Sequence, residues 1–228
     1  MFGGWDLERV VLVAVQLALV VFSIMVHEVS HGLAAYRLGD PTAKRAGRLT
    51  LNPAKHLDPF GSVLLPALMS LAGGPVFAYA KPVPYNPYNL RGNRRTGELV
   101  VAFAGPFSNL VQGLVGAGVA QAAFAAYPGA SAGLQDVLYW AYNVGYLYCV
   151  INFVLMFFNI IPLPPLDGSS IIGAVLPARY MNQFYKVKQY SMFILLCLLF
   201  LVPMVTPWDP LGWYMRHTAY ALADVLVP

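Results

Sequence analysis

The residues best suited to chemistry stand together near the N-terminus, in the run His27-Glu28-Val29-Ser30-His31. On a helix, residues four apart share a face, so the imidazoles of His27 and His31 can bind one metal ion. Glu28 projects near the same face, where its carboxylate can act as a general base toward water. The structural alternative is a pair of histidines hydrogen-bonded to polar neighbours inside a helical bundle. Three ionisable residues within five positions of an apolar stretch are costly to bury, which favours the functional interpretation.

Two histidines leave a hydrolytic zinc site one protein ligand short, because such a site uses three protein ligands and keeps one position open. The candidate third ligand is Asp167, near the end of the run NIIPLPPLDG at residues 159–168. Three prolines in four positions end the preceding helix, and Gly168 allows a tight turn that can aim Asp167 back between helices. A carboxylate that caps the next helix is the alternative for Asp167 taken alone.

Four further polar residues are weaker candidates. Asn159 lies where its helix begins to unwind, and it either contacts the substrate or the reacting carbonyl, or has a structural role at the helix end. Asn109 lies on a stripe of small residues at intervals of four, which is typical of two membrane helices in close approach, so helix packing is its expected role. His56 and His217 are expected to be a loop residue and an interfacial residue rather than ligands.

The composition defines the class of protein that must position these residues. Of the 228 residues, 58% are hydrophobic and 11% are charged, against roughly 25% charged in soluble domains. The apolar residues fall in long blocks, so we predict an all-α integral membrane protein, a polytopic bundle, and exclude a soluble enzyme. The length allows about four to six membrane segments and one domain over residues 1–228. Cys149 and Cys197 lie in apolar runs without CxxC spacing and are predicted to be reduced core residues.

The apolar blocks long enough to cross a membrane lie at residues 10–38, 99–127, 138–161 and 190–205. The block at residues 60–72 is too short to cross and is expected to be re-entrant or interfacial. The proline-rich residues 76–89 are expected to be extended, turn-rich chain, packed against protein or water. Residues 208–228 are expected to form an interfacial helix, with a partial crossing as the alternative.

The distribution of basic residues predicts the topology. Nine of the fourteen Lys and Arg residues lie from Arg37 to Arg95, three more lie from Arg179 to Lys188, and the link at residues 127–138 has none. Basic loops are retained on the cytoplasmic side, so both basic regions belong there if residues 60–72 do not cross. The first span then runs from outside to the cytoplasm. Topology accounts for the net charge of +4, and no nucleic-acid partner is expected.

Three motifs together resemble the site-2 protease family of intramembrane zinc metalloproteases, namely HEVSH at 27–31, AGPFSN at 104–109 and NIIPLPPLDG at 159–168. The signature of that family pairs HExxH with NxxPxxxLDG in this order. The stretches GRLTLNPAKHLDPFG and AKPVPYNP also resemble the family, so the resemblance covers most of residues 20–175. It implies that His27, His31 and Asp167 are zinc ligands, that Glu28 is the catalytic base and that the site is reached from the cytoplasmic side. With no room for the PDZ or CBS domains of many relatives, the chain resembles a compact member with a catalytic core at about residues 10–175.

The predicted function is therefore hydrolysis of peptide bonds within or near transmembrane segments, with Zn2+ as cofactor and with membrane-spanning proteins and the lipid bilayer as partners. A membrane helix shields its own peptide bonds, so a substrate must unwind, and residues 81–89 are a candidate to pair with it as an added strand. A metal-ion transporter and a catalytically silent metal-binding protein are the alternatives. A di-iron oxidase would need more than the four histidines present. The sequence gives no indication of the oligomeric state.

Overall fold

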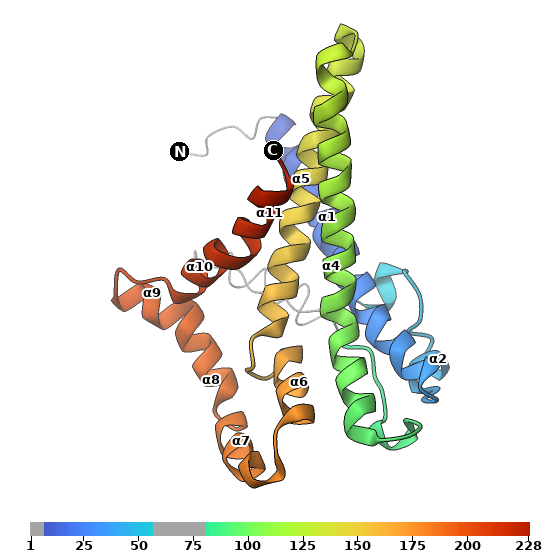
Figure 1. Ribbon diagram of the computed structural model, residues 1–228, viewed down its shortest axis with the longest axis vertical. Helices are drawn as coiled ribbons and strands as arrows, with labels where there is room; N and C mark the ends of the chain where they lie inside the picture. Colours follow the sequence, from blue (N-terminus) through green and yellow to red (C-terminus); the bar gives the residue numbers. More distant parts are fainter. Residues whose placement is uncertain (1–6, 57–80) are drawn as a thin grey trace.

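The computed structural model describes residues 7–56 and 81–228, with side chains described from residue 11 onward (Figure 1). The segment expected to be re-entrant, residues 60–72, lies outside the described residues, as do residues 76–80 of the expected extended chain. Every regular element in the described part of the chain is a helix. The prediction of an all-α protein is confirmed.

Three long helices form the centre of the molecule: α1 (Leu7–Arg37), α4 (Arg94–Ala126) and α5 (Ala132–Ile160). Each is long and apolar enough to cross a membrane, and each matches a span predicted from the sequence. A bent pair of helical segments, Ala178–Lys188 and Ser191–Val205, which meet at 59°, is a fourth candidate. The described residues thus hold three candidate spans, or four if the bent pair is one span, against about four to six predicted.

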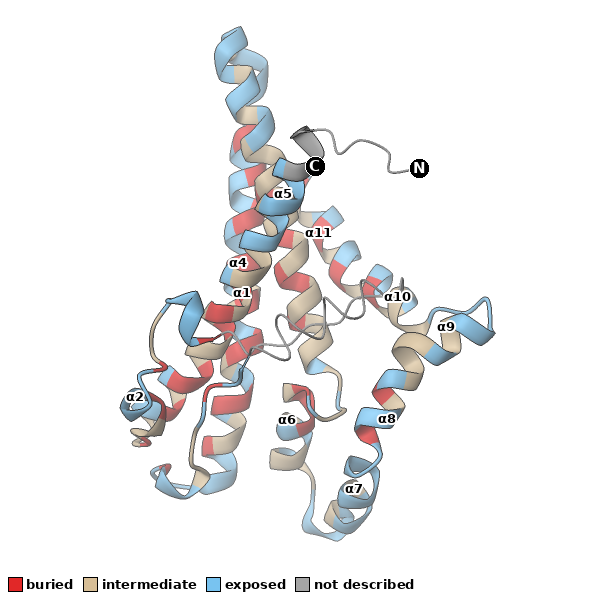
Figure 2. Ribbon diagram, turned by 180° about the vertical axis from the view of Figure 1, so that it is seen from behind, coloured by how far each residue is buried: buried red, intermediate tan, exposed pale blue. Residues whose placement is uncertain are grey.

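The long helices pack through their small residues. A short turn joins α4 to α5, and the two helices run antiparallel side by side (Figure 1). At Gly116 an added Cβ would lie 2.6 Å from the backbone nitrogen of Cys149, so only glycine allows this approach. Buried residues gather where α1, α4 and α5 face one another (Figure 2). Exposed apolar side chains such as Leu17, Val115 and Val137 are suited to contact with lipid.

The chain beyond α5 first packs a short helix against the bundle, then leaves the bundle and returns to it with the last helix. It forms, in order, α6 (Asp167–Val175), α7 (Met181–Lys188), α8 (Ser191–Leu196), a π-helical segment (Cys197–Leu201) and α9 (Val202–Val205). A last helix follows as α10 (Pro210–Met215), a π-helical segment (Arg216–Tyr220) and α11 (Ala221–Leu226). Its buried face, which includes Met215 and Ala219, packs against Phe153 and the free, buried Cys149 of α5. The helix expected at residues 208–228 is therefore present, and it lies against a long helix of the bundle.

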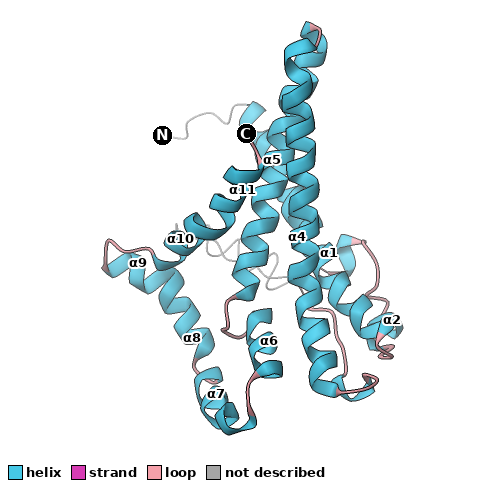
Figure 3. Ribbon diagram, viewed as in Figure 1, coloured by secondary structure: helices cyan, strands magenta, loops and turns pink. Residues whose placement is uncertain are grey.

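Short elements surround the C-terminal half of α1, which carries residues 27–31. They are α2 (Thr42–Arg45) and two 3-10 turns (Pro53–Lys55 and Pro87–Asn89), each flanked by loop residues in the described part of the chain (Figure 3). On another side, α6 packs against α4 and α5. The candidate site thus lies where segments distant in the sequence meet.

Candidate metal centre

The two histidines of the HExxH run lie on one face of α1, as their spacing predicts. Nε2 of His27 and Nε2 of His31 are 3.0 Å apart, and the two rings meet edge to face with their centroids 4.7 Å apart. Both side chains are buried. One helical turn therefore presents two imidazole nitrogens to the same point.

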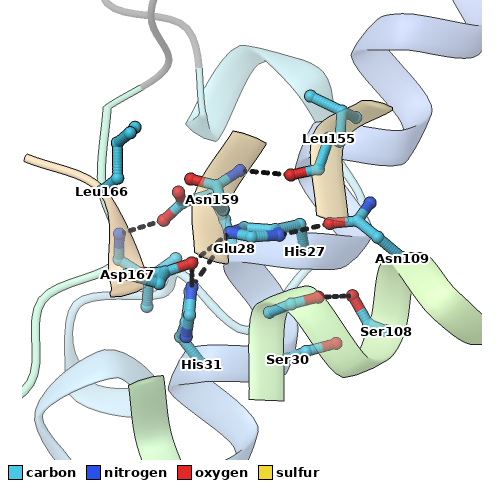
Figure 4. Close-up of polar contacts among 12 residues, drawn as sticks. His27, Glu28, Ser30, His31, Ser108, Asn109, Leu155, Asn159, Leu166 and Asp167 are labelled. Carbon is cyan, nitrogen blue, oxygen red and sulfur yellow. Dashed lines mark hydrogen bonds and ion pairs between the residues drawn. The ribbon is translucent and has the colours of Figure 1, made fainter. Parts of the chain in front are cut away.

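Asp167 joins them from the first residue of α6, directly after the proline-rich turn. Its Oδ2 lies 3.1 Å from Nε2 of His27 and 3.3 Å from Nε2 of His31 (Figure 4). Leu166 occupies the N-cap position of α6, and no side-chain cap bond is formed there. The structure thus places Asp167 with the two histidines and not in the capping role.

The other ring nitrogen of each histidine contacts a fixed oxygen. Nδ1 of His27 lies 2.5 Å from Oδ1 of Asn109, and Nδ1 of His31 lies 2.7 Å from the backbone oxygen of Val101. A carbonyl oxygen can only accept, so both Nδ1 atoms carry a hydrogen, and in the neutral imidazoles that bind metals both Nε2 atoms then carry a lone pair. Two lone pairs and a carboxylate oxygen of Asp167 therefore face one another.

This arrangement fits a zinc ion. Ligands about 2.0 Å from tetrahedral zinc are about 3.3 Å from one another, close to the separations of 3.0, 3.1 and 3.3 Å among these three atoms. Oδ2 of Asp167 is also buried without a hydrogen-bond partner among the described residues, which is costly unless a cation is there. Two neutral imidazoles and one carboxylate are a donor set that zinc accepts.

Asn109 belongs to a buried chain of polar groups that links three helices. Its Nδ2 donates to Oδ1 of Asn152, at 2.9 Å, and Nδ2 of Asn152 donates to Oγ of Ser23, at 3.0 Å. All three residues are fully buried. The sequence predicted only a helix-packing role for Asn109 and did not predict its contact with His27. Asn152 and Ser23 were missed, although polar residues inside apolar spans are a signal that could have found them.

Gly105 brings α4 against the histidines. An added Cβ there would lie 2.5 Å from Cε1 of His31 and 2.6 Å from Cε1 of His27. Real Cβ atoms essentially never approach so closely, so a side chain at position 105 would displace one ring. The small-residue stripe of α4 therefore serves the site as well as helix packing.

Glu28 has its carboxylate beside this cluster (Figure 4). Its Oε2 accepts a hydrogen bond of 2.8 Å from the backbone N–H of Val83. Asn159 lies nearby at the end of α5, where its Nδ2 donates to the carbonyl of Leu155, at 2.9 Å. Asn159 is thus near the cluster, and its amide hydrogen bond is made within its own helix.

The structure argues against strand pairing between a substrate and residues 81–86. The N–H groups of Lys81, Val83 and Asn86 donate to His56, Glu28 and Asp40, respectively. Pro82 and Pro84 have no N–H to offer. An edge strand needs alternating free donors and acceptors. The backbone N–H groups of residues 81–86 are mostly bonded within the protein, so strand pairing of a substrate with these residues is not supported.

The two remaining histidines lie outside the cluster. Nε2 of His56 contacts the backbone oxygen of Thr50, at 2.7 Å, and the residue is buried in a loop. Nδ1 of His217 contacts the carbonyl of Trp213 one turn earlier, at 2.8 Å. Neither belongs to the group that can hold a metal.

The fold and the cluster define a helical membrane protein with a candidate metal-binding site between its spans. Residues 129–202 match the model of peptidase family M50. A Bacillus subtilis protein, "Putative zinc metalloprotease YwhC", is 37% identical over 187 residues, which are 81% of this chain and 78% of that protein. On this similarity the chain belongs to peptidase family M50, as its motifs predicted.

More distant relatives carry a similar name. Proteins named "Putative zinc metalloprotease Rip2" from Mycolicibacterium smegmatis and Mycobacterium tuberculosis are 27% and 28% identical to the chain, respectively. Each alignment covers 82% of this chain and 66% of the relative. No solved structure gives a significant match.

Proposed function

We propose that this protein is an intramembrane zinc endopeptidase that hydrolyses peptide bonds within or near the transmembrane segments of membrane-protein substrates. The observation that carries the proposal is the convergence of ligand atoms from His27, His31 and Asp167, beside the carboxylate of Glu28, among helices long enough to span a membrane. Membership of family M50 and the names of the relatives agree with a zinc-dependent peptidase.

In this proposal Nε2 of His27, Nε2 of His31 and Oδ2 of Asp167 hold the zinc ion. Zinc, when bound, supplies a Lewis acid that polarises the substrate carbonyl and activates water. Glu28 takes a proton from the attacking water and passes it to the leaving nitrogen. Because Oε2 of Glu28 accepts the N–H of Val83, we assign the proton to Oε1, the oxygen that this bond leaves free. In this proposal the amide of Asn159 gives up its hydrogen bond to the Leu155 carbonyl and donates to the reacting carbonyl instead.

The site is proposed to open to the cytoplasmic side. His31 is six residues from Arg37, at the end of α1, which corresponds to about 9 Å of helix. The metal therefore lies below the surface that the basic residues mark as cytoplasmic, within the hydrocarbon boundary. A substrate helix must unwind locally before its peptide bond can reach this depth, since its backbone groups are otherwise paired.

Glu28→Gln tests the reaction directly. The variant keeps the size of the side chain and should keep its zinc, while cleavage of co-expressed single-span membrane proteins falls by about 100-fold or more. Glu98→Gln, which changes another glutamate on a long helix, near the start of α4, is the matched control and should cleave at the parent rate. A metal transporter would not show a loss of cleavage with zinc still bound. Cleavage by Glu28→Gln at the parent rate, with zinc equally bound, would overturn the proposal.

A further inference from the structure

The contact between Glu28 and Val83 depends on a close approach to α1. Gly32 lies one turn after Glu28 on the same face of the helix. An added Cβ at Gly32 would lie 2.7 Å from Cγ1 of Val83 and 2.7 Å from Cδ2 of Leu49. The missing side chain at position 32 therefore lets the backbone of residue 83 reach the carboxylate of Glu28.

Arg48 holds the chain immediately before Val83. The residue is 8% exposed. Its guanidinium donates to the carbonyls of Lys55, Lys81 and Pro82, the last two at 2.6 Å and 3.3 Å. Hydrogen bonds from a charged donor are stronger than neutral ones, and here they offset the cost of burying the charge. Two consecutive carbonyls are thereby fixed beside the N–H that Glu28 binds.

Asp40 holds the same segment from the other end. It is fully buried, and it accepts hydrogen bonds from the backbone N–H of Asn86, at 2.7 Å, and from Nδ2 of Asn89, at 2.8 Å. Burial alone would raise the pKa of Asp40, but these bonds and those from Thr42 outweigh it and hold the pKa below its usual value. The carboxylate is therefore charged at neutral pH and anchors the segment strongly.

We propose that residues 81–89 form a positioning clamp for Glu28, in which Arg48 and Asp40 hold the segment so that the Val83 N–H orients the carboxylate. The inference rests on the proposed function only for the role of Glu28 as base. With Oε2 held by Val83, the carboxylate does not need to be oriented when the substrate arrives, and such preorganisation favours the reaction. Arg48 and Asp40 are positioning residues, since neither belongs to the metal cluster.

Hydrogen exchange of the full-length protein in detergent tests the clamp without zinc or activity. A peptide over residues 81–86 has few exchangeable amides because positions 82 and 84 are prolines, so the Val83 amide can be followed. Glu28→Ala and Asp40→Asn should each speed its exchange by about tenfold, the effect of one lost hydrogen bond. Lys186→Gln, on the exposed surface of α7, is the control and should change nothing. Equal exchange in the parent and Glu28→Ala would overturn the clamp.

Kinetics test what the clamp does. Val83→Pro removes the N–H and suits an extended chain between two prolines, whereas Val83→Ala shortens the side chain and keeps the N–H. We expect kcat of Val83→Pro to fall by about 10- to 100-fold, with KM and zinc content unchanged. Val83→Ala should stay within a few-fold of the parent.

Two results would contradict the clamp. A kcat for Val83→Pro equal to that of Val83→Ala would show that the N–H has no role, and a change confined to KM would assign the segment to the substrate. If Val83→Pro fails to fold, Arg48→Met replaces it, because this variant loses the hydrogen bonds to the carbonyls of Lys81 and Pro82. The clamp then predicts a lower kcat and an unchanged KM for Arg48→Met. Cleavage that persists in Glu28→Gln would reject the proposed function. Hydrogen exchange at Val83 would then still show whether residues 81–89 hold the carboxylate of Glu28.

Discussion

Oδ1 of Asn109 lies 2.5 Å from Nδ1 of His27, so an amide on α4 sets the tautomer of an imidazole on α1. The amide is itself held, because its Nδ2 donates to Asn152 of α5. A buried amide in this position cannot rotate without losing a hydrogen bond in an apolar surrounding. The three long helices thus fix which nitrogen of His27 is free to bind a metal.

Replacement of Asn109 should therefore weaken zinc binding without abolishing it. Asn109→Ala removes the acceptor for Nδ1 of His27, and lost partners of this kind typically cost 10- to 100-fold in metal affinity. Competition with a zinc chelator measures the affinity. Gln121→Ala changes another amide of α4, remote from the cluster, and should leave the affinity unchanged. An Asn109→Ala protein that binds zinc as tightly as the parent would show that the tautomer is set by other means.

Asp167 should be required for zinc binding. In Asp167→Ala the two histidines keep their positions on α1 but lose the carboxylate that completes the three ligand atoms. Metal analysis of the purified protein should find well below one zinc per chain, whereas Asp136→Ala, an exposed carboxylate at the start of α5, should keep a full complement. Undiminished zinc in a folded Asp167→Ala protein would remove Asp167 from the site.

Two glycines of α4 should respond in opposite ways to alanine. Gly105→Ala places a Cβ within 2.6 Å of both histidine rings, so zinc affinity and the midpoint of thermal unfolding should both fall. Gly118 faces open space, and Gly118→Ala should raise stability by up to about 1 kcal/mol through its better helix propensity. Thermal unfolding with and without zinc measures both effects. Equal responses at the two positions would contradict the close approach at Gly105.

The topology can be tested by labelling single cysteines from either side of the membrane. The distribution of basic residues predicts that residues 40–98 and 165–188 lie in the cytoplasm and that residues 128–136 lie outside. A cysteine at position 94 should react with an impermeant reagent only after the membrane is opened, and one at position 136 should react in intact cells. Cys149 is buried in the structure and should add little background, and Cys197→Ser removes the other thiol. Labelling of position 94 in intact cells would reverse the proposed orientation.

The local pattern of residue types was enough to identify the spans and the three candidate ligands. Long apolar blocks form helices in a membrane whatever surrounds them, because every backbone group must be paired within its own segment. The spacing of four between His27 and His31 places both rings on one face of any helix. Asp167 was identified as the candidate third ligand because two histidines leave a zinc site one ligand short and the proline-rich turn before Asp167 must end the preceding helix. The resemblance to a family implied the same ligand.

The groups that orient these side chains were decided by tertiary structure alone. Asn109 is 82 positions from His27, the Val101 carbonyl is 70 positions from His31, and the Val83 amide is 55 positions from Glu28. Two of the three are backbone groups, which every residue type except proline supplies in the same form, so no pattern of residue types can mark them. Their positions follow from how closely the helices and loops pack, at Gly105 and Gly32 above all. The residue types therefore determined which atoms can hold a metal, and the packing of distant segments determined how those atoms point.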